Sequence, residues 1–267
     1  NRYAFDLGAT MIEQSSNGPT LVIDNFRVRS GDQTIVEAPR AEVSIDPLSV
    51  LTGNVQPRRV QVSNIDINLI VLPDGSVSVA SGQNAAPIAV TPAPTPRANI
   101  ENTPGRVTRA ALLAQAGVAL RNFFEFATSP GAAIGAVEHV AIKSGRLIVE
   151  DKTADRKTVF EDLDLEFDKE KTRTDLVLRA RGPNGPLTVQ AHAQGLKGEL
   201  RTLDLSVKDV SFDEIILAGG IRNVAVDTDV KLAANARFAL DGEGRVREAN
   251  ASFGLGSGYL RLLDPDH

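Results

Sequence analysis

The chain has 267 residues, of which 42% are hydrophobic and only 4% aromatic, and it contains neither Trp nor Cys. It is long enough to bury a large surface of Val, Leu, Ile and Ala, whereas the lack of Cys excludes disulfides, thiolate metal sites and a cysteine nucleophile. The net charge is −5 with both signs mixed along the chain, and no Lys/Arg cluster forms the basic footprint of a nucleic-acid-binding protein.

Residues 1–80 alternate apolar and polar side chains with period two, which predicts an N-terminal β segment. Leu21 and Ile23 follow this alternation, and Phe26 and Val28 continue it one residue out of phase. Such a shift indicates a β-bulge. Further on, a turn at residues 73–75, Pro-Asp-Gly, leads into another short strand.

Residues 81–107 are rich in Pro and Ala and weakly patterned, which is typical of an extended linker. Residues 108–130 then place apolar side chains on one stripe at helical spacing, so we predict one amphipathic helix that packs on the sheet. No stretch is apolar enough to span a bilayer, and no signal peptide is visible. Because the sequence begins at Asn1 in the middle of a strand pattern, we interpret the chain as a fragment of a larger protein.

Residues 131–267 resume the alternation and predict a second β segment. Turns are predicted at Ser144-Gly145, at residues 183–185 (Pro-Asn-Gly) and at residues 241–244 (Asp-Gly-Glu-Gly). Between the turns the alternation is long, and it reaches from Val230 to Leu240. Ordinary strands have about 5–6 residues, so some strands here are expected to be unusually long.

Two similar phrases flank the linker and the helix and indicate an internal repeat. The first is Val28–Gly31 followed by Ile35–Glu37, and the second is Ile142–Gly145 followed by Ile148–Glu150. Each phrase predicts a strand, a tight turn and a second strand. The two β segments are therefore expected to share one architecture.

The fold class depends on what packs against the apolar faces of the strands. One helix of about 30 Å covers only a few strands. Either two sheets pack face to face in a β-sandwich, or one apolar face stays open for an apolar ligand. Long strands and scarce aromatics favour the open form, so we predict a mainly β fold: an elongated, curved, mostly antiparallel sheet, or β-groove, with one amphipathic helix. A β-sandwich is the alternative.

Several phrases resemble AsmA-like proteins. They are Ile35–Gly53, which contains an Ala-Pro-Arg-Ala stretch, Val60–Leu69 followed by Asp74–Val77, and Gly145–Asp151. The resemblance covers most of the chain outside residues 81–107. It implies a periplasmic β-groove, anchored to the inner membrane by a segment missing from this chain, that shields lipid acyl chains and contributes to phospholipid transport or outer-membrane lipid homeostasis between the two membranes.

A groove of this kind needs no catalytic residue and no cofactor, because each buried methylene contributes about 0.8 kcal/mol. The expected partners are phospholipid or another acyl-chain lipid and envelope proteins, but not nucleic acid. Alternating aliphatic side chains are the candidate lipid-binding residues. They are Val60, Val62, Ile65, Ile67, Leu69, Leu163, Leu165, Leu176, Leu178, Leu232, Ala234 and Phe238.

Two other functions compete with the groove. An enzyme acting on carbohydrate would need converging titratable groups, but His139 and His192 lie in strand patterns without a second metal-ligand residue at suitable spacing. The carboxylates of residues 161–168 alternate with Leu and Phe as the wet face of a strand, so we do not expect an enzyme. A β-rich envelope scaffold that binds an extended protein by strand addition is the alternative function.

Overall fold

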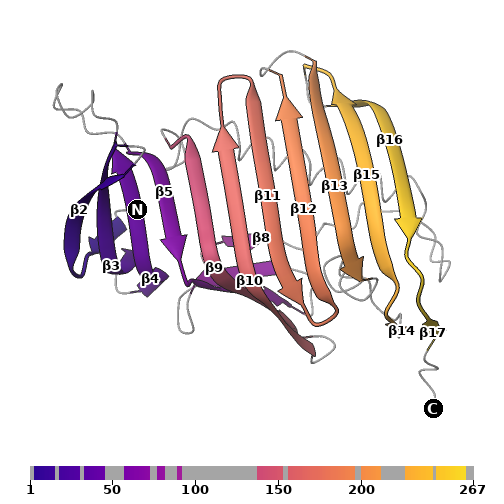
Figure 1. The fold of residues 1–267 in the computed structure, drawn as a ribbon, viewed down its shortest axis with the longest axis horizontal. Helices are drawn as coiled ribbons and strands as arrows, with labels where there is room; N and C mark the ends of the chain where they lie inside the picture. The colour runs from indigo at the N-terminus through magenta and orange to yellow at the C-terminus, as the bar shows by residue number, and fades with distance from the viewer. Residues whose placement is uncertain are drawn as a thin grey trace.

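The computed structural model has strands and no helix in the part of the chain that it describes. The described residues are 3–15, 18–30, 33–45, 57–72, 77–81, 89–91, 137–152, 156–195, 200–211, 226–242 and 245–262. The predicted fold class is confirmed: the strands form one open, curved, mostly antiparallel sheet rather than a sandwich (Figure 1). The predicted helix at residues 108–130 lies outside the described residues.

The main sheet has 15 strands. Its path runs through β1 (Tyr3–Asp6), β3 (Gly18–Ser30), β4 (Gln33–Ile45), β5 (Pro57–Ser63), β9 (His139–Asp151), β10 (Arg156–Lys169), β11 (Arg173–Gly182), β12 (Gly185–Gln194), β13 (Arg201–Ser211), β15 (Lys231–Leu240) and β16 (Val246–Leu255). Off this path lie β2 (Thr10–Ser15), which pairs with β3, and then β6 (Asp66–Val71), β7 (Val77–Ser81) and β8 (Ala89–Thr91), which extend from β9. A second sheet pairs β14 (Val226–Thr228) with β17 (Leu260–Leu262). Among the described pairings, only β5–β9 and β6–β9 are parallel.

Two predicted hairpins are confirmed. β11 and β12 meet at a tight turn in which Gly182 faces Gly185. Gly185 has a φ of 114°, a conformation that favours glycine because it has no Cβ. β15 and β16 are joined across residues 241–244, where the Asp241 N–H donates to the carbonyl of Arg245 at 2.9 Å.

The predicted turn at Ser144-Gly145 is wrong. β9 runs through both residues without ending, and Ser144 forms a bulge with a φ of 53°. A Cβ on Gly145 would lie 3.0 Å from Ile142 Cγ2 and 3.0 Å from the carbonyl oxygen of Ile65, so this glycine allows close packing rather than a turn. In the first phrase of the predicted repeat, by contrast, Ser30 pairs with Gln33 and the chain does turn. The two phrases therefore have different structures.

The segment predicted as a linker, residues 81–107, begins at the last residue of β7 and contains β8. β8 pairs with β7 in an antiparallel register that places Val77 opposite Thr91. A short piece of this Pro-rich segment thus adds a strand to the sheet. Residues 82–88 and 92–107 lie outside the described residues.

Five non-glycine residues with left-handed backbone lie on one line across the sheet. They are Asn25 in β3, Asn64 between β5 and β6, Ser144 in β9, Asp162 in β10 and Asp209 in β13, with φ between 51° and 59°. The register aligns them on the same side of one cross-strand row. Four of them follow their residue of this row by two positions, and Asp162, on an antiparallel strand, precedes Leu165 of the row by three positions. Asn and Asp tolerate this conformation better than most side chains do. We call this line the crease.

At the crease the spacing of apolar residues changes from two to three, so the apolar side chains stay on the same face of the sheet. The pairs are Ile23 and Phe26, Val62 and Ile65, Ile142 and Gly145, Phe160 and Leu163, and Val207 and Val210. Beyond the crease the chain covers this face. Ile67 and Leu69 of β6 pack against a cluster of buried residues, which we call the corner cluster. Its members are Val149, Phe160, Leu163, Ala180, Leu187 and Val210. Figure 1 shows β8 and its neighbours crossing behind the central strands.

Candidate functional site

Two rows of side chains, the apolar rows, run across the sheet on one face from β2 to β16. The first contains Thr10, Ile23, Ala41, Val62, Ile142, Leu165, Leu178, Val189, Val207, Ala234 and Phe253. The second contains Ile12, Leu21, Val43, Val60, Val140, Phe167, Leu176, Ala191, Leu205, Ala236 and Ala251. Only Thr10 is polar, and none is charged. With about 4.8 Å between strands, each row is roughly 50 Å long.

The structure brings all twelve sequence-predicted lining residues to this face. The apolar rows contain Val60, Val62, Leu165, Leu176, Leu178 and Ala234. Leu232 and Phe238 flank the rows on β15. The remaining four lie nearer the crease than the two rows, or past it. Leu163 belongs to the corner cluster, Ile67 and Leu69 pack against that cluster, and Ile65 lies next to Gly145. Whether they contact lipid stays a prediction.

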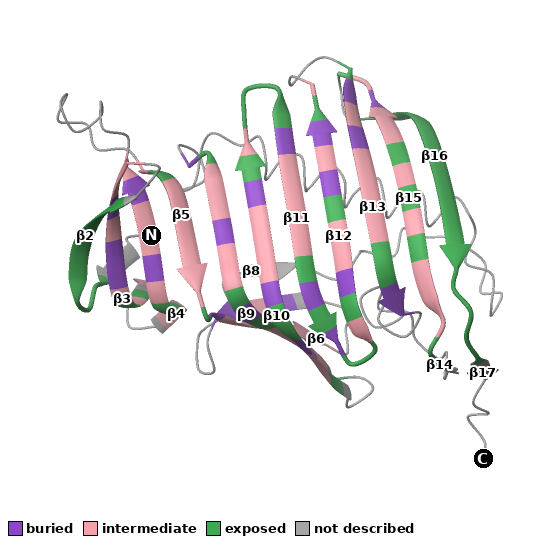
Figure 2. Cartoon of the chain, in the orientation of Figure 1, coloured by how far each residue is buried: buried purple, intermediate pink, exposed green. Residues whose placement is uncertain are grey.

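Burial changes along the apolar face. Leu163 in the corner cluster is 2% exposed, whereas Phe253 and Leu255 on β16 are 76% and 61% exposed. Most residues of the apolar rows between these extremes are half-buried. In Figure 2 the central strands carry buried, intermediate and exposed residues in turn, whereas β16 is exposed throughout. The face is therefore an apolar trough that is exposed at β16 and packed in two places. One is the corner cluster, and the other is a second buried cluster of Ala191, Ala193, Leu203 and Leu240.

The opposite face is mainly polar, and several of its charged residues pair across strands, as Lys143 does with Glu166 and Arg237 with Asp204. One row of this face contains Glu13, Thr20, Ser44, Arg59, His139, Asp168, Asp175, His192, Asp204, Arg237 and Asn250. His139 Nδ1 lies 2.5 Å from Asp168 Oδ1, and His192 Nδ1 lies 2.7 Å from Asp175 Oδ1. Both histidines thus have a carboxylate partner on the neighbouring strand, which sequence reasoning did not identify.

Two carboxylates of this face are held in the ionised form. Partial burial acts to raise the pKa of Asp175, but hydrogen bonds with Arg173 and His192 outweigh it and lower this pKa below its usual value. The Arg173 Nε–H donates to Asp175 at 2.6 Å. A hydrogen bond from Lys143 likewise lowers the pKa of Glu166. Neither carboxylate is tuned to act as a proton donor near neutral pH.

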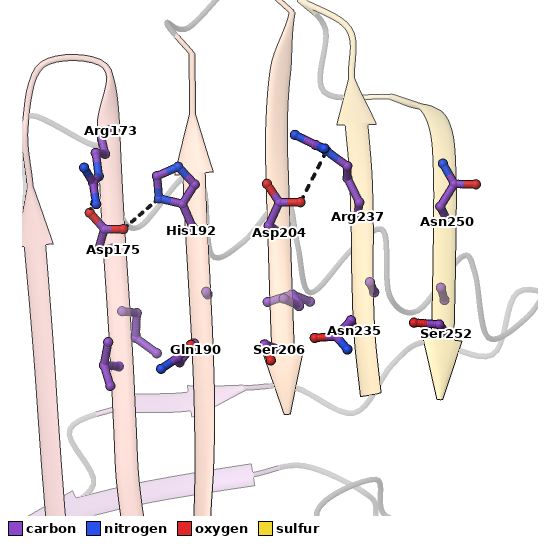
Figure 3. Close-up of a pocket in the computed structure, with 16 residues that line it drawn as sticks. Arg173, Asp175, Gln190, His192, Asp204, Ser206, Asn235, Arg237, Asn250 and Ser252 are labelled. Atoms are coloured by element: carbon purple, nitrogen blue, oxygen red, sulfur yellow. Dashed lines mark hydrogen bonds and ion pairs between the residues drawn. The ribbon is translucent and has the colours of Figure 1, made fainter. Parts of the chain in front are cut away.

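An open hollow of about 900 Å³ lies on the polar face between β11 and β16 (Figure 3). Its polar lining residues are Arg173, Asp175, Gln190, His192, Asp204, Ser206, Asn235, Arg237, Asn250 and Ser252. In Figure 3 the charged groups engage each other in pairs rather than converge on one point. The described residues contain no group of three His, Cys, Asp or Glu placed to hold a metal ion.

Comparison with known proteins adds no relative: no family model matches the chain, and no curated protein matches it. Within the described ranges there is no helix with the length and apolar character needed to cross a membrane. The feature of the described residues that bears most on function is the contrast between the exposed apolar face and the mainly polar opposite face.

Proposed function

We propose that this chain is a β-groove module that shields lipid acyl chains in the periplasm, as part of an AsmA-like protein anchored to the inner membrane. The observation that carries the proposal is the pair of apolar rows. They continue through eleven successive strands without a charged side chain, and most of their residues are only half-buried.

The dimensions of the rows suit acyl chains. Half of a bilayer core of about 30 Å is the reach of one chain, about 15 Å, so rows of roughly 50 Å exceed it about three-fold. Each methylene removed from water contributes about 0.8 kcal/mol. Aliphatic side chains provide this gain without directional contacts, so a chain is able to shift along the rows without breaking hydrogen bonds.

The polar face of the sheet also supports the proposal. Its paired ions and amides keep that surface wetted, so one face of the sheet faces water while the other offers the apolar trough. Lipid head groups are then expected to remain in solvent at the open side of the trough. The proposed function is non-enzymatic and contributes to phospholipid transport or outer-membrane lipid homeostasis.

Native mass spectrometry with lipid extraction tests the proposal on the 267-residue chain purified from a bacterial host in minimal detergent. We expect co-purified phospholipid in the wild-type protein and its loss in Leu232→Glu, because Leu232 lies on the apolar face opposite Val210 and Leu255. Ala233→Glu is the matched control, since its side chain lies on the polar face opposite Gly254. A folded, lipid-free wild-type protein would contradict the proposal, and so would lipid retained by Leu232→Glu.

A further inference from the structure

The hollow on the polar face is a furrow between two rows of side chains that cross the strands (Figure 3). The charged row contains Asp175, His192, Asp204, Arg237 and Asn250, and the neutral row contains Val177, Gln190, Ser206, Asn235 and Ser252. Five strands about 4.8 Å apart make the furrow roughly 19 Å long. The two rows lie two residues apart on each strand, which makes it about 7 Å wide.

The floor of the furrow is backbone. It is formed by residues of the second apolar row, whose side chains lie on the opposite face: Leu176, Ala191, Leu205, Ala236 and Ala251. The main chain on this floor belongs to the ladders that join β11 to β16. The described residues that line the furrow therefore offer side chains of the two rows to a ligand, and no strand edge.

The charges in the furrow balance. The Arg173 Nε–H donates to Asp175 at 2.6 Å, and Arg237 Nε lies 3.3 Å from Asp204 Oδ1. His192 contacts Asp175 as well, at 2.7 Å. Two arginines thus face two aspartates at close range, so the furrow has no excess charge that would select an anion such as phosphate, or a cation. An uncharged polar ligand fits this balance.

The neutral row provides hydrogen-bonding groups at regular intervals. Gln190, Ser206, Asn235 and Ser252 lie on four neighbouring strands, so an amide or a hydroxyl recurs about every 4.8 Å. Gln190, Asn235 and Ser252 are exposed. Amides and hydroxyls both donate and accept hydrogen bonds, as the hydroxyl groups of a sugar do. A regular row of such groups suits a ligand that itself repeats.

We propose that the furrow binds a linear, uncharged oligosaccharide that lies across β11 to β16. Each sugar unit carries hydroxyl groups on both sides of its ring, and the furrow has room for one ring between the rows, so a single glycan chain reaches both rows. A peptide fits less well, because its main chain finds no strand edge to pair with on this floor. The described lining residues include no Phe, Tyr or Trp on which a sugar ring stacks, so we expect weak binding.

The site goes beyond the proposed lipid-binding function. It lies on the opposite face of the sheet from the apolar rows, and it does not depend on what those rows bind. Leu232→Glu, the variant expected to lose lipid, changes only the apolar face and should bind oligosaccharide like the wild type. Failure of one proposal is therefore distinguishable from failure of the other.

Saturation-transfer difference NMR on the 267-residue chain, with chitotetraose and cellotetraose as probes, detects weak ligands of this kind. We expect saturable transfer to consecutive sugar units of at least one probe, and weaker binding of the matching monosaccharide, which spans only part of the furrow. Gln190→Ala should weaken binding about five-fold, the effect of one lost hydrogen bond. Asn235→Ala should act in the same way.

Gln194→Ala is the matched control, because Gln194 is exposed on the same face of the same strand as Gln190 but does not line the furrow. It should bind the probes like the wild type, and all variants should keep the wild-type circular dichroism spectrum and Tm. The proposal is overturned if neither probe binds, or if Gln190→Ala and Gln194→Ala bind equally. It is also overturned if the uncharged peptide Gly-Asn-Ser-Gly-Asn-Ser competes as strongly as the sugars, which would identify a peptide as the ligand.

Discussion

The corner cluster and β16 are two ends of one apolar face, and they differ in what covers them. Leu163 in the corner is 2% exposed, whereas Phe253 on β16 is 76% exposed. The same alternation of side chains builds both ends. The difference arises at the crease, beyond which β6 packs its apolar side chains onto the face. Alternation therefore determines which face is apolar. Beyond the crease β6 covers that face, on the row side a second buried cluster with Leu203 and Leu240 packs on it, and at β16 it is exposed.

Truncating one side chain at each end should give the largest difference in the free energy of unfolding. Leu163→Ala removes a fully packed side chain and should lower the free energy of unfolding by about 2–5 kcal/mol. Phe253→Ala removes an exposed one and should change it by less than about 0.5 kcal/mol. Urea unfolding of both variants measures the two values. Equal losses would show that the corner cluster is not the stabilising end.

Adding a methyl group at each end should also change stability differently at the packed end and at the exposed end. A Cβ on Gly145 meets Ile142 and Ile65 at 3.0 Å, whereas a Cβ on Gly254 of β16 meets nothing within 4 Å. Gly145→Ala should destabilise the protein by about 1–3 kcal/mol. Gly254→Ala should be neutral or stabilise it by up to about 1 kcal/mol, because it restricts the unfolded chain. Thermal unfolding compares them; a tolerated Gly145→Ala would show that the corner relaxes easily.

A substitution in the crease should have a smaller effect on stability. Asn64 has a φ of 57°, a conformation that costs an L-residue with a Cβ about 1–2 kcal/mol. Asn64→Ala should therefore lower stability by about 1 kcal/mol, and Asn64→Gly should leave it within about 0.5 kcal/mol of the wild type. The two variants are compared by chemical denaturation. If Asn64→Gly is as damaging as Asn64→Ala, the side chain rather than the backbone conformation of Asn64 matters.

The smallest change in the free energy of unfolding is expected for a substitution on the polar face, behind the exposed part of the apolar rows. The pKa of Asp175 is lowered in the folded protein, despite partial burial, by hydrogen bonds with Arg173 and His192. A lowered folded-state pKa stabilises the protein above the unfolded value of about 3.9, and this contribution is lost as pH falls through the folded-state pKa. Asp175→Asn should remove up to about 1 kcal/mol at neutral pH and flatten the loss of stability below about pH 4. Unfolding measured from pH 7 to pH 2 tests the slope.

Sequence patterning predicts the apolar face well, because a strand has a side-chain period of two and one buried face makes it visible. The twelve lining residues share a face for this reason. The shift at Phe26 also marked the position of the crease in β3, where Asn25 has a φ of 54°, although the pairing of β3 with β4 shows no register shift there, so the predicted bulge is wrong. The other positions of the crease were not identified, although each occurs in a four-residue pattern: an apolar residue, a polar residue, then Asn, Asp or Ser, and an apolar residue or Gly. Val62–Ile65 and Val207–Val210 are examples.

Long-range pairing explains what patterning missed. Ser-Gly is a common turn dipeptide, and only pairing with β10 makes Ser144 part of a continuous strand: its N–H donates to Asp164 Oδ1 at 3.0 Å. The two histidine–aspartate pairs depend in the same way on neighbouring strands. The parallel pairing of β9 with β5 and β6 joins residues 80 positions apart, such as Arg146 and Asp66. No local pattern specifies such a register.

Photo-crosslinking from neighbouring residues of β11 tests most directly whether the apolar face holds lipid. Leu178 lies in the first apolar row, and Val177, the preceding residue, lies on the polar face beside the hollow. A photoreactive phenylalanine analogue is placed at one position or the other in the cell envelope, and adducts are identified by mass spectrometry. We expect phospholipid adducts from position 178 and none from position 177. Adducts from position 177 alone, or equally from both positions in folded protein, would contradict an acyl-chain groove on the apolar face.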